Sequence, residues 1–130
     1  MLHRMLQQQM KIEGSVMHGD GYGSTIGYPT ANLDVDFTQV SIAPGIYAGR
    51  AFWDGHEQDA ALIIDADRGR VEAHILDFEG DLYGRHLRVE PLQKIRDYQQ
   101  FSSEADLIAQ IGQDIAAIRH FLGYYVHRDH

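Results

Sequence analysis

The chain has 130 residues, enough for one domain with a single core, and 19 acidic residues against 11 lysines and arginines give a formal net charge of −8. That charge excludes nucleic acid as an expected partner, because phosphate backbones are bound by clustered basic side chains. No segment approaches the roughly 18 apolar residues of a membrane span. The first residues lack a signal-peptide core, and no cysteine is present to form a disulfide. We therefore expect a cytoplasmic monomer with no membrane partner.

The first part of the chain divides into an arm and the start of a domain. Residues 1–9 are expected to form an N-terminal arm, either a short amphipathic helix or a frayed segment, and residues 10–130 one domain. Residues 11–17 form a strand that leads into a glycine-rich segment. Four further strands are predicted where β-branched and aromatic residues concentrate, at residues 45–53, 58–64, 71–78 and 85–92. Such short strands at near-even spacing indicate a mainly β fold, a small antiparallel barrel.

The end of the chain changes from strand to helix periodicity. Apolar residues recur every three or four positions from Leu107 to Leu122, which predicts a helix over about residues 103–122. Ser103 followed by Asp106 is typical of an N-cap, and Gly123 is predicted to end the helix. Such a helix is about 30 Å long at 1.5 Å per residue, enough to lie across one side of the barrel.

The segment from residue 18 to residue 33 reads HGDGYGSTIGYPTANL and is the richest in candidate site residues. Backbone amides of a glycine-rich loop can form a concave anion site, and the oxygens of Thr30 and Asn32 suit a hard cation such as Mg²⁺. The spacing fits neither a P-loop nor a dinucleotide-binding fingerprint. From these residues alone, a nucleotide site and a flexible hairpin connection both remain open.

Four motifs in order resemble the ATP-dependent riboflavin kinase domain, a family that also forms the C-terminal domain of bacterial bifunctional enzymes. The resemblance covers roughly residues 10–122, and the Pro-Thr-Ala-Asn string within the glycine-rich segment is its most specific part. The motifs are residues 14–33, PGIYA at 44–48, VEAHILDF with DLYG at 71–84, and residues 101–103 with the helix that follows. The resemblance implies a closed Greek-key barrel of about six strands with a C-terminal helix packed on it.

The resemblance also implies a reaction and a set of site residues. A kinase of this family transfers the γ-phosphate of ATP, bound with Mg²⁺, to the 5′-hydroxyl of riboflavin and produces FMN and ADP. Glu72 would be the catalytic base, although by its alternation with Val71 and Ala73 it is also an ordinary exposed strand carboxylate. Thr30 and Asn32, which share a face of an extended segment, would hold the metal and phosphates. The other residues implied in nucleotide binding are His18, Gly19, Gly21, Gly23, Gly27 and Pro29.

The flavin side of the site is less well defined by the sequence. Tyr83 and Phe101 could flank the isoalloxazine ring, and Arg96 and Arg119 could contact substrate, the alternative for each arginine being an ion-paired or solvated surface position. Bacterial two-domain members carry an adenylyltransferase domain before this one, so a separate FAD-forming adenylyltransferase is an expected partner.

Two departures from the family pattern leave the function open. Residues 65–70 replace a longer loop that helps to frame the active site, and residues 96–101 lack the glutamate and lysine of the family's R-x-E-x-K-F segment. The expected function is a riboflavin kinase. The alternatives are a catalytically weakened flavin- or nucleotide-binding module of the same fold, and a kinase of the archaeal CTP-using kind, which the Pro-Thr-Ala-Asn string disfavours.

Overall fold

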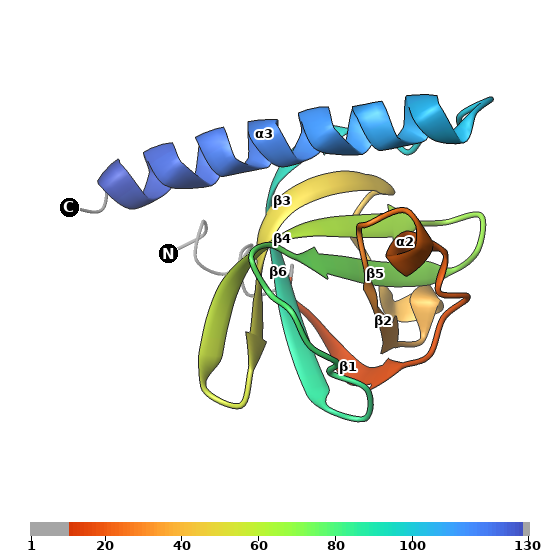
Figure 1. Cartoon of the computed structure of the whole chain (residues 1–130). Helices are drawn as coiled ribbons and strands as arrows, with labels where there is room; N and C mark the ends of the chain where they lie inside the picture. Colours follow the sequence, from red (N-terminus) through yellow and green to blue (C-terminus); the bar gives the residue numbers. More distant parts are fainter. Residues whose placement is uncertain (1–10, 129–130) are drawn as a thin grey trace.

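A closed antiparallel β-barrel with one long helix across its side is the architecture of the chain (Figure 1). The structure is a computed structural model that describes residues 11–128, with side chains through residue 123; the predicted arm, residues 1–9, lies outside the described residues. In chain order the elements are β1 (Ile12–Met17), α2 (Tyr22–Thr25), β2 (Ala31–Asp34), a 3₁₀ turn (Phe37–Gln39), β3 (Gly45–Trp53), β4 (His56–Asp65), β5 (Arg70–Ile75), β6 (His86–Arg96) and α3 (Glu104–Arg128). The predicted mainly β barrel with a C-terminal helix is confirmed.

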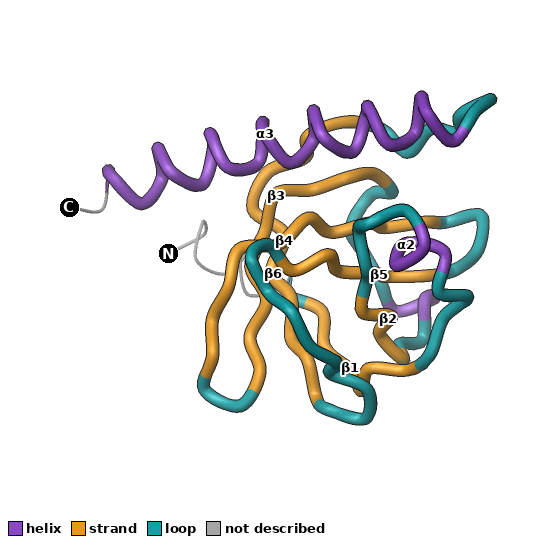
Figure 2. Tube along the Cα trace, viewed as in Figure 1, coloured by secondary structure: helices purple, strands orange, loops and turns teal. Residues whose placement is uncertain are grey.

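The order of the strands around the barrel is β1-β2-β5-β4-β3-β6. Strands β3, β4 and β5 follow one another as hairpins and β6 returns beside β3, which is a Greek key. Strand β1 closes the barrel by pairing with both β2 and β6. Because β2 pairs with β5, the glycine-rich connection between β1 and β2 lies against β5 although some 40 residues separate them in sequence (Figure 2).

The two longest strands show how the local sequence determines the pairing. Asp54 and Gly55 both have positive φ, 47° and 80°, as a two-residue hairpin turn requires, so the predicted β3–β4 hairpin is confirmed. Strand β6 extends to Arg96, beyond the predicted end at residue 92. Irregularities in its register with β3, one of them between Ala48 and Gly49, bend β6 so that it continues to pair.

Strand β5 is shorter than predicted at its C-terminal end. It stops at Ile75 instead of Phe78, because Asp77 takes the left-handed conformation with φ of 57° and the chain leaves the sheet. Within β5 the side chains alternate strictly, with Val71, Ala73 and Ile75 in the barrel core. The neighbouring residues of β5 therefore lie on the outer face.

Helix α3 packs against the barrel through a second, smaller core. Ile118 and Leu122 are fully buried against Ala48, Ala61 and Leu76, whose small or branched side chains give the helix a close approach. The predicted N-cap is confirmed, because the Asp106 backbone N–H donates to Ser103 Oγ at 3.1 Å. The predicted end at Gly123 is wrong: Gly123 keeps a helical backbone and α3 continues to Arg128. No helix among residues 11–128 is long and apolar enough to span a membrane.

Candidate active site

Two cavities meet at Thr30, where the glycine-rich segment enters β2. The first, named here the loop-side cavity, has a volume of about 510 Å³ and is lined by the glycine-rich segment, β5 and residues 78–83. The second, the helix-side cavity, has a volume of about 230 Å³ and is lined by α2, the outer face of β4 and β5, residues 96–101 and α3. Thr30 lines both cavities, Asn32 lines the loop-side cavity and Glu72 lines the helix-side cavity.

The structure brings the three predicted central residues together. Asn32 on β2 is paired in register with Glu72 on β5, so their side chains leave the sheet on the same face. Thr30 Oγ1 donates a hydrogen bond of 3.1 Å to Glu72 Oε1. Val71 and Ala73 point to the barrel core, so the strand alternation directs the Glu72 carboxylate outward to the junction between the two cavities.

The environment of Glu72 makes its carboxylate a stronger proton acceptor than an exposed one. Burial raises the pKa of its carboxyl group, because removing the charged form from water is unfavourable. The hydrogen bond from Thr30 and the positive charges of Arg70 and Arg68 oppose that rise, and the nearby Asp20 adds to it. The alternative reading of Glu72 as an exposed strand carboxylate is therefore wrong: the covering segments leave it only partly accessible.

Asn32 is fixed by a close backbone approach. Its side chain is 7% exposed, and a Cβ added to Gly19 would collide with the Asn32 side-chain amide. Any larger residue at position 19 would therefore force the Asn32 side chain to move. The oxygens of Thr30, Asn32 and Glu72 form a hard donor set of the kind that Mg²⁺ prefers. Among the described residues no group of three or more histidine, aspartate or glutamate side chains gathers to hold a metal.

The glycine-rich segment connects the antiparallel strands β1 and β2 and contains a short helical turn, α2. Gly21 and Gly27, with φ of 74° and 92°, take left-handed conformations on either side of it. A Cβ on Gly23 would collide with the Tyr28 carbonyl oxygen, and Tyr28 N–H donates to the Gly23 carbonyl at 2.7 Å. Of the residues predicted to bind nucleotide, all but Gly27 line the loop-side cavity.

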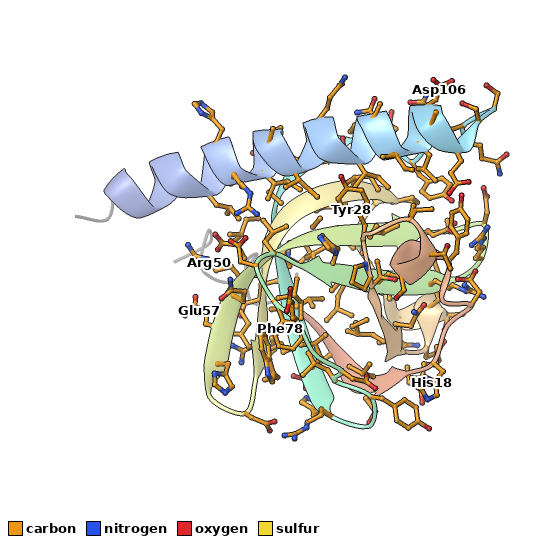
Figure 3. All side chains as sticks on the ribbon, in the orientation of Figure 1. His18, Tyr28, Arg50, Glu57, Phe78 and Asp106 are labelled. Atoms are coloured by element: carbon orange, nitrogen blue, oxygen red, sulfur yellow. The ribbon has the colours of Figure 1, made fainter. Side chains whose placement is uncertain are left out.

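Two aromatic side chains attach this segment to its surroundings. His74 Nδ1 lies 2.7 Å from the Pro29 carbonyl oxygen, which can only accept, so the ring carries its proton on Nδ1. The Tyr28 ring meets the His74 ring edge-on at a centroid distance of 5.6 Å. Tyr28 lies beside α3 (Figure 3): a Cβ on Gly112 of that helix would be 3.9 Å from the Tyr28 hydroxyl. The sequence did not indicate this role for Tyr28.

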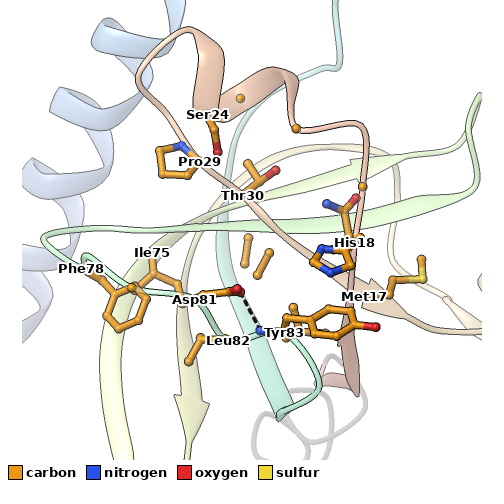
Figure 4. A pocket seen from close by; sticks show the side chains of 18 of the residues that line it. Met17, His18, Ser24, Pro29, Thr30, Ile75, Phe78, Asp81, Leu82 and Tyr83 are labelled. Atoms are coloured by element: carbon orange, nitrogen blue, oxygen red, sulfur yellow. Dashed lines mark hydrogen bonds between the residues drawn. The ribbon is translucent and has the colours of Figure 1, made fainter.

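At the opposite end of the loop-side cavity, His18 stacks on Tyr83. Their ring centroids are 3.7 Å apart and the planes differ by 13° (Figure 4). The Asp81 carboxylate fixes the turn before Tyr83 by accepting a hydrogen bond of 2.8 Å from the Tyr83 backbone N–H. Tyr83 remains 55% exposed, which leaves a flat aromatic surface at the cavity mouth.

The residues predicted to contact flavin fall in three different places. Tyr83 lines the loop-side cavity, whereas Arg96 and Phe101 line the helix-side cavity. Arg119 lines neither cavity; it donates from both terminal nitrogens to Asp77 at 2.8 Å and joins α3 to the end of β5. Arg119 therefore occupies an ion-paired surface position, as the alternative to substrate contact predicted.

The helix-side cavity has an apolar wall and a fixed cationic group. Arg96 forms a two-pronged ion pair with the buried Asp114 of α3, at 2.8 to 3.0 Å, and its guanidinium lies 5.6 Å from the centre of the Phe101 ring. Gln110 also donates to Asp114, at 2.9 Å. The apolar lining of this cavity is formed by Ile26, Ile46, Ala61, Ile63, Leu107, Ile111 and Ile115. Such a wall with aromatic edges suits a planar ring system.

The sequence of this chain is similar to those of known riboflavin kinase proteins. The chain is 38% identical over 126 residues to the bifunctional riboflavin kinase/FMN adenylyltransferase of Escherichia coli strain K12, covering 92% of this chain and 40% of that protein. The chain therefore spans less than half the length of that relative.

Two solved structures share the fold. A riboflavin kinase from Trypanosoma brucei superposes with a TM-score of 0.68 at 24% identity, covering 87% of this chain and 76% of that one. A Streptococcus pneumoniae structure described as a macrolide-efflux protein gives a TM-score of 0.71 at 32% identity, covering 84% of this chain but only 38% of that longer one. The riboflavin kinase model matches residues 6–122, and the chain belongs to the flavokinase family.

Proposed function

We propose that this chain is a riboflavin kinase that transfers the γ-phosphate of ATP to the 5′-hydroxyl of riboflavin. The observation that carries the proposal is the 3.1 Å hydrogen bond from Thr30 to Glu72 at the junction of the two cavities. It joins a candidate base on the wall of one cavity to a candidate phosphate-binding residue that lines both. A group transferred between ligands in the two cavities would have to pass this point.

The proposed chemistry needs one proton acceptor and a fixed geometry. Glu72 takes the proton of the riboflavin 5′-hydroxyl, and the hydroxyl oxygen forms a bond to the γ-phosphorus. The bond from that phosphorus to the β-phosphate oxygen breaks, so the products are FMN and ADP. Because positioning and charge neutralisation supply most of the acceleration in phosphoryl transfer, a single base in a partly buried site is sufficient. The raised pKa of Glu72 makes it a better base than an exposed carboxylate.

The metal expected for this reaction fits the residues present. Thr30 and Asn32 would hold Mg²⁺ together with the β- and γ-phosphates, and the ion would neutralise charge that develops on the phosphoryl oxygens. The tight packing of Asn32 beneath Gly19 supports this assignment, because it leaves the side chain little freedom to move away.

The two cavities suit different halves of the substrate pair. The glycine-rich wall of the loop-side cavity offers backbone amides and an exposed aromatic face at Tyr83, which suit a purine nucleotide. The apolar wall of the helix-side cavity, with Phe101 and Arg96, suits the isoalloxazine ring. We assign ATP to the first and riboflavin to the second; Arg119 then has a structural role in holding α3.

The test is to incubate the chain with riboflavin, ATP and Mg²⁺ and to separate the flavins by chromatography. The proposal expects FMN to accumulate over many turnovers and its formation to stop when EDTA is added. Quenching of riboflavin fluorescence without FMN would instead support the binding-module alternative. Replacing ATP by CTP in a parallel reaction tests the third alternative, and a strong preference for CTP would contradict the proposal.

The name of the Escherichia coli relative includes an FMN adenylyltransferase activity, and this chain covers 40% of that relative. Both cavities that meet at Thr30 are already assigned to the two substrates of the kinase reaction. We therefore assign adenylyl transfer to a protein segment other than this barrel. Addition of ATP and FMN alone to the chain should yield no FAD.

A further inference from the structure

A cluster of three charged side chains joins the glycine-rich segment to the β4–β5 turn. Asp20 Oδ2 lies 3.7 Å from Arg68 Nη1 and 3.6 Å from Arg70 Nη1. Asp20 belongs to the glycine-rich segment, whereas Arg68 lies in the turn that replaces the longer family loop and Arg70 is the first residue of β5. The cluster is the ionic connection between the two segments.

The β4–β5 turn presents the two arginines in a defined position. The buried Asp65 accepts hydrogen bonds from the backbone N–H groups of Asp67 and Arg68, at 3.1 and 3.2 Å, and its carboxylate lies 3.8 Å from Arg68 Nε. Gly69, with φ of 64°, completes the turn. Asp65 therefore holds the backbone of the turn independently of Asp20.

Both guanidinium groups lie near the proposed point of phosphoryl transfer. Arg70 and Glu72 are two residues apart on β5 and therefore leave the sheet on the same face. Arg68 lines the helix-side cavity together with Glu72 and Thr30. The electrostatic influence of both arginines and of Asp20 on the pKa of the Glu72 carboxyl reflects the same proximity.

The ion pairs of this cluster contribute little to the stability of the fold. Asp20 and Arg68 are both more than half exposed, at 54% and 57% of their side-chain surface, and exposed ion pairs of this kind contribute about 0–1 kcal/mol. A weak pair is easily exchanged for a stronger ligand. A phosphoryl group carries more charge than a carboxylate and offers three oxygens to the planar donor fork of arginine.

We propose that Arg68 and Arg70 form a binding subsite for the phosphoryl group that is transferred, and that Asp20 occupies the subsite in the free protein. This inference rests on the proposed function and adds a phosphate-binding element to it. The terminal phosphate of the nucleotide, or the phosphate of the flavin product, displaces the Asp20 carboxylate from the two guanidinium groups. In a chain with a net charge of −8, the two arginines supply local positive potential where the anionic substrate arrives.

The proposal predicts opposite effects for the two sides of the cluster. In R68Q/R70Q, ATP binding in the presence of Mg²⁺ should weaken by about 10- to 100-fold, because charge-assisted contacts are lost. In D20N, ATP should bind several-fold more tightly, because a competing carboxylate is removed. The Asp20 Oδ1 atom accepts a hydrogen bond of 3.0 Å from Tyr22 N–H. The amide oxygen introduced by D20N can accept the same bond, so the start of α2 is kept.

Calorimetric titration of the whole chain without riboflavin measures these affinities directly. AMP, which lacks the γ-phosphate, should bind all variants with equal affinity, whereas FMN binding should weaken in R68Q/R70Q. R68K/R70K keeps the charge but loses the fork geometry and should give an intermediate ATP affinity. The matched control is R85Q, which removes an exposed arginine paired with Asp54 across two other turns and should leave ATP affinity unchanged.

The outcome that overturns the inference is a purely structural effect. If the cluster only holds the loop in place, D20N and R68Q/R70Q will change ATP affinity in the same direction, and AMP will be affected as strongly as ATP. The proposed function can fail separately, because it is tested by FMN formation. Suppose that R68Q/R70Q loses affinity for ATP but not for AMP, while the original chain forms no FMN. That result would support the phosphate subsite and contradict the kinase proposal.

Discussion

Strand β5 presents two faces with different consequences. Val71, Ala73 and Ile75 point into the barrel core, where apolar contact is the main requirement. Arg70 and Glu72 point outward: Arg70 pairs with Asp20 of the glycine-rich segment, and Glu72 lines the helix-side cavity together with residues of α3. The two faces are formed by alternate residues of the same six-residue strand. Ala73 and Ile75 also line the loop-side cavity, but Val71 lines neither cavity, so variants at Val71 and Glu72 can separate stability from chemistry.

The largest expected effect is on the outer face. E72Q should lower kcat by about 10²–10⁴-fold, because the general base is lost. The glutamine side chain of this variant can still accept the hydrogen bond from Thr30, so the variant should fold and bind riboflavin normally. Initial rates of FMN formation and riboflavin fluorescence titrations measure both quantities. E57Q, on an exposed part of β4, is the matched control, and near-normal turnover in E72Q would remove Glu72 from the proposed role.

The inner face should respond in the opposite way. Val71 is 1% exposed and lines neither cavity. V71A should lower the free energy of unfolding by about 1–3 kcal/mol through lost burial and a small void. Urea unfolding followed by circular dichroism measures this loss. Turnover at a temperature where the variant remains folded should stay close to that of the original chain; a large fall in turnover would show that the two faces are not separable.

The pH dependence sharpens the contrast at Glu72 itself. Burial raises the pKa of Glu72 in the folded state. At neutral pH the ionised carboxylate therefore lowers the free energy of unfolding, and at acid pH the protonated carboxyl group does not. E72Q should therefore have a higher melting temperature than the original chain at neutral pH, and the difference should shrink as the pH falls through the raised pKa. The kcat/KM of the original chain should fall over the same range, because the base becomes protonated. A melting difference that is constant with pH would contradict the assigned cause.

Local sequence signals predicted the features that depend on neighbouring residues. The strand over residues 45–53 coincides with β3, the Asp54–Gly55 hairpin formed as expected, and Ser103 caps α3. Strand ends were less predictable. The register irregularities along β6 depend on its pairing with β3, and no residue pattern indicated the left-handed conformation of Asp77.

The site was predictable from the sequence only in part. Alternation on β5 gave the outward direction of Glu72, but its burial comes from the glycine-rich segment and α3, which are remote in sequence. The resemblance to the kinase family selected Thr30, Asn32 and Glu72 as a group, and the structure brings them together. The ion pairs of Asp20 with the arginines of the β4–β5 turn had no signal in the sequence, because each side chain alone looks like an ordinary surface charge.

The smallest predicted effect concerns Gly123, where the predicted end of α3 was wrong. Gly123 has a helical backbone and nothing lies within 4 Å of an added Cβ, so G123A should raise the free energy of unfolding by about 0.5–1 kcal/mol. Gly21 offers the matched comparison, because its added Cβ also meets nothing but its φ is 74°. G21A should therefore destabilise the chain, since an alanine is strained in the left-handed conformation. Urea midpoints of the two variants should move in opposite directions. A loss of stability in G123A would contradict the helical conformation assigned to Gly123.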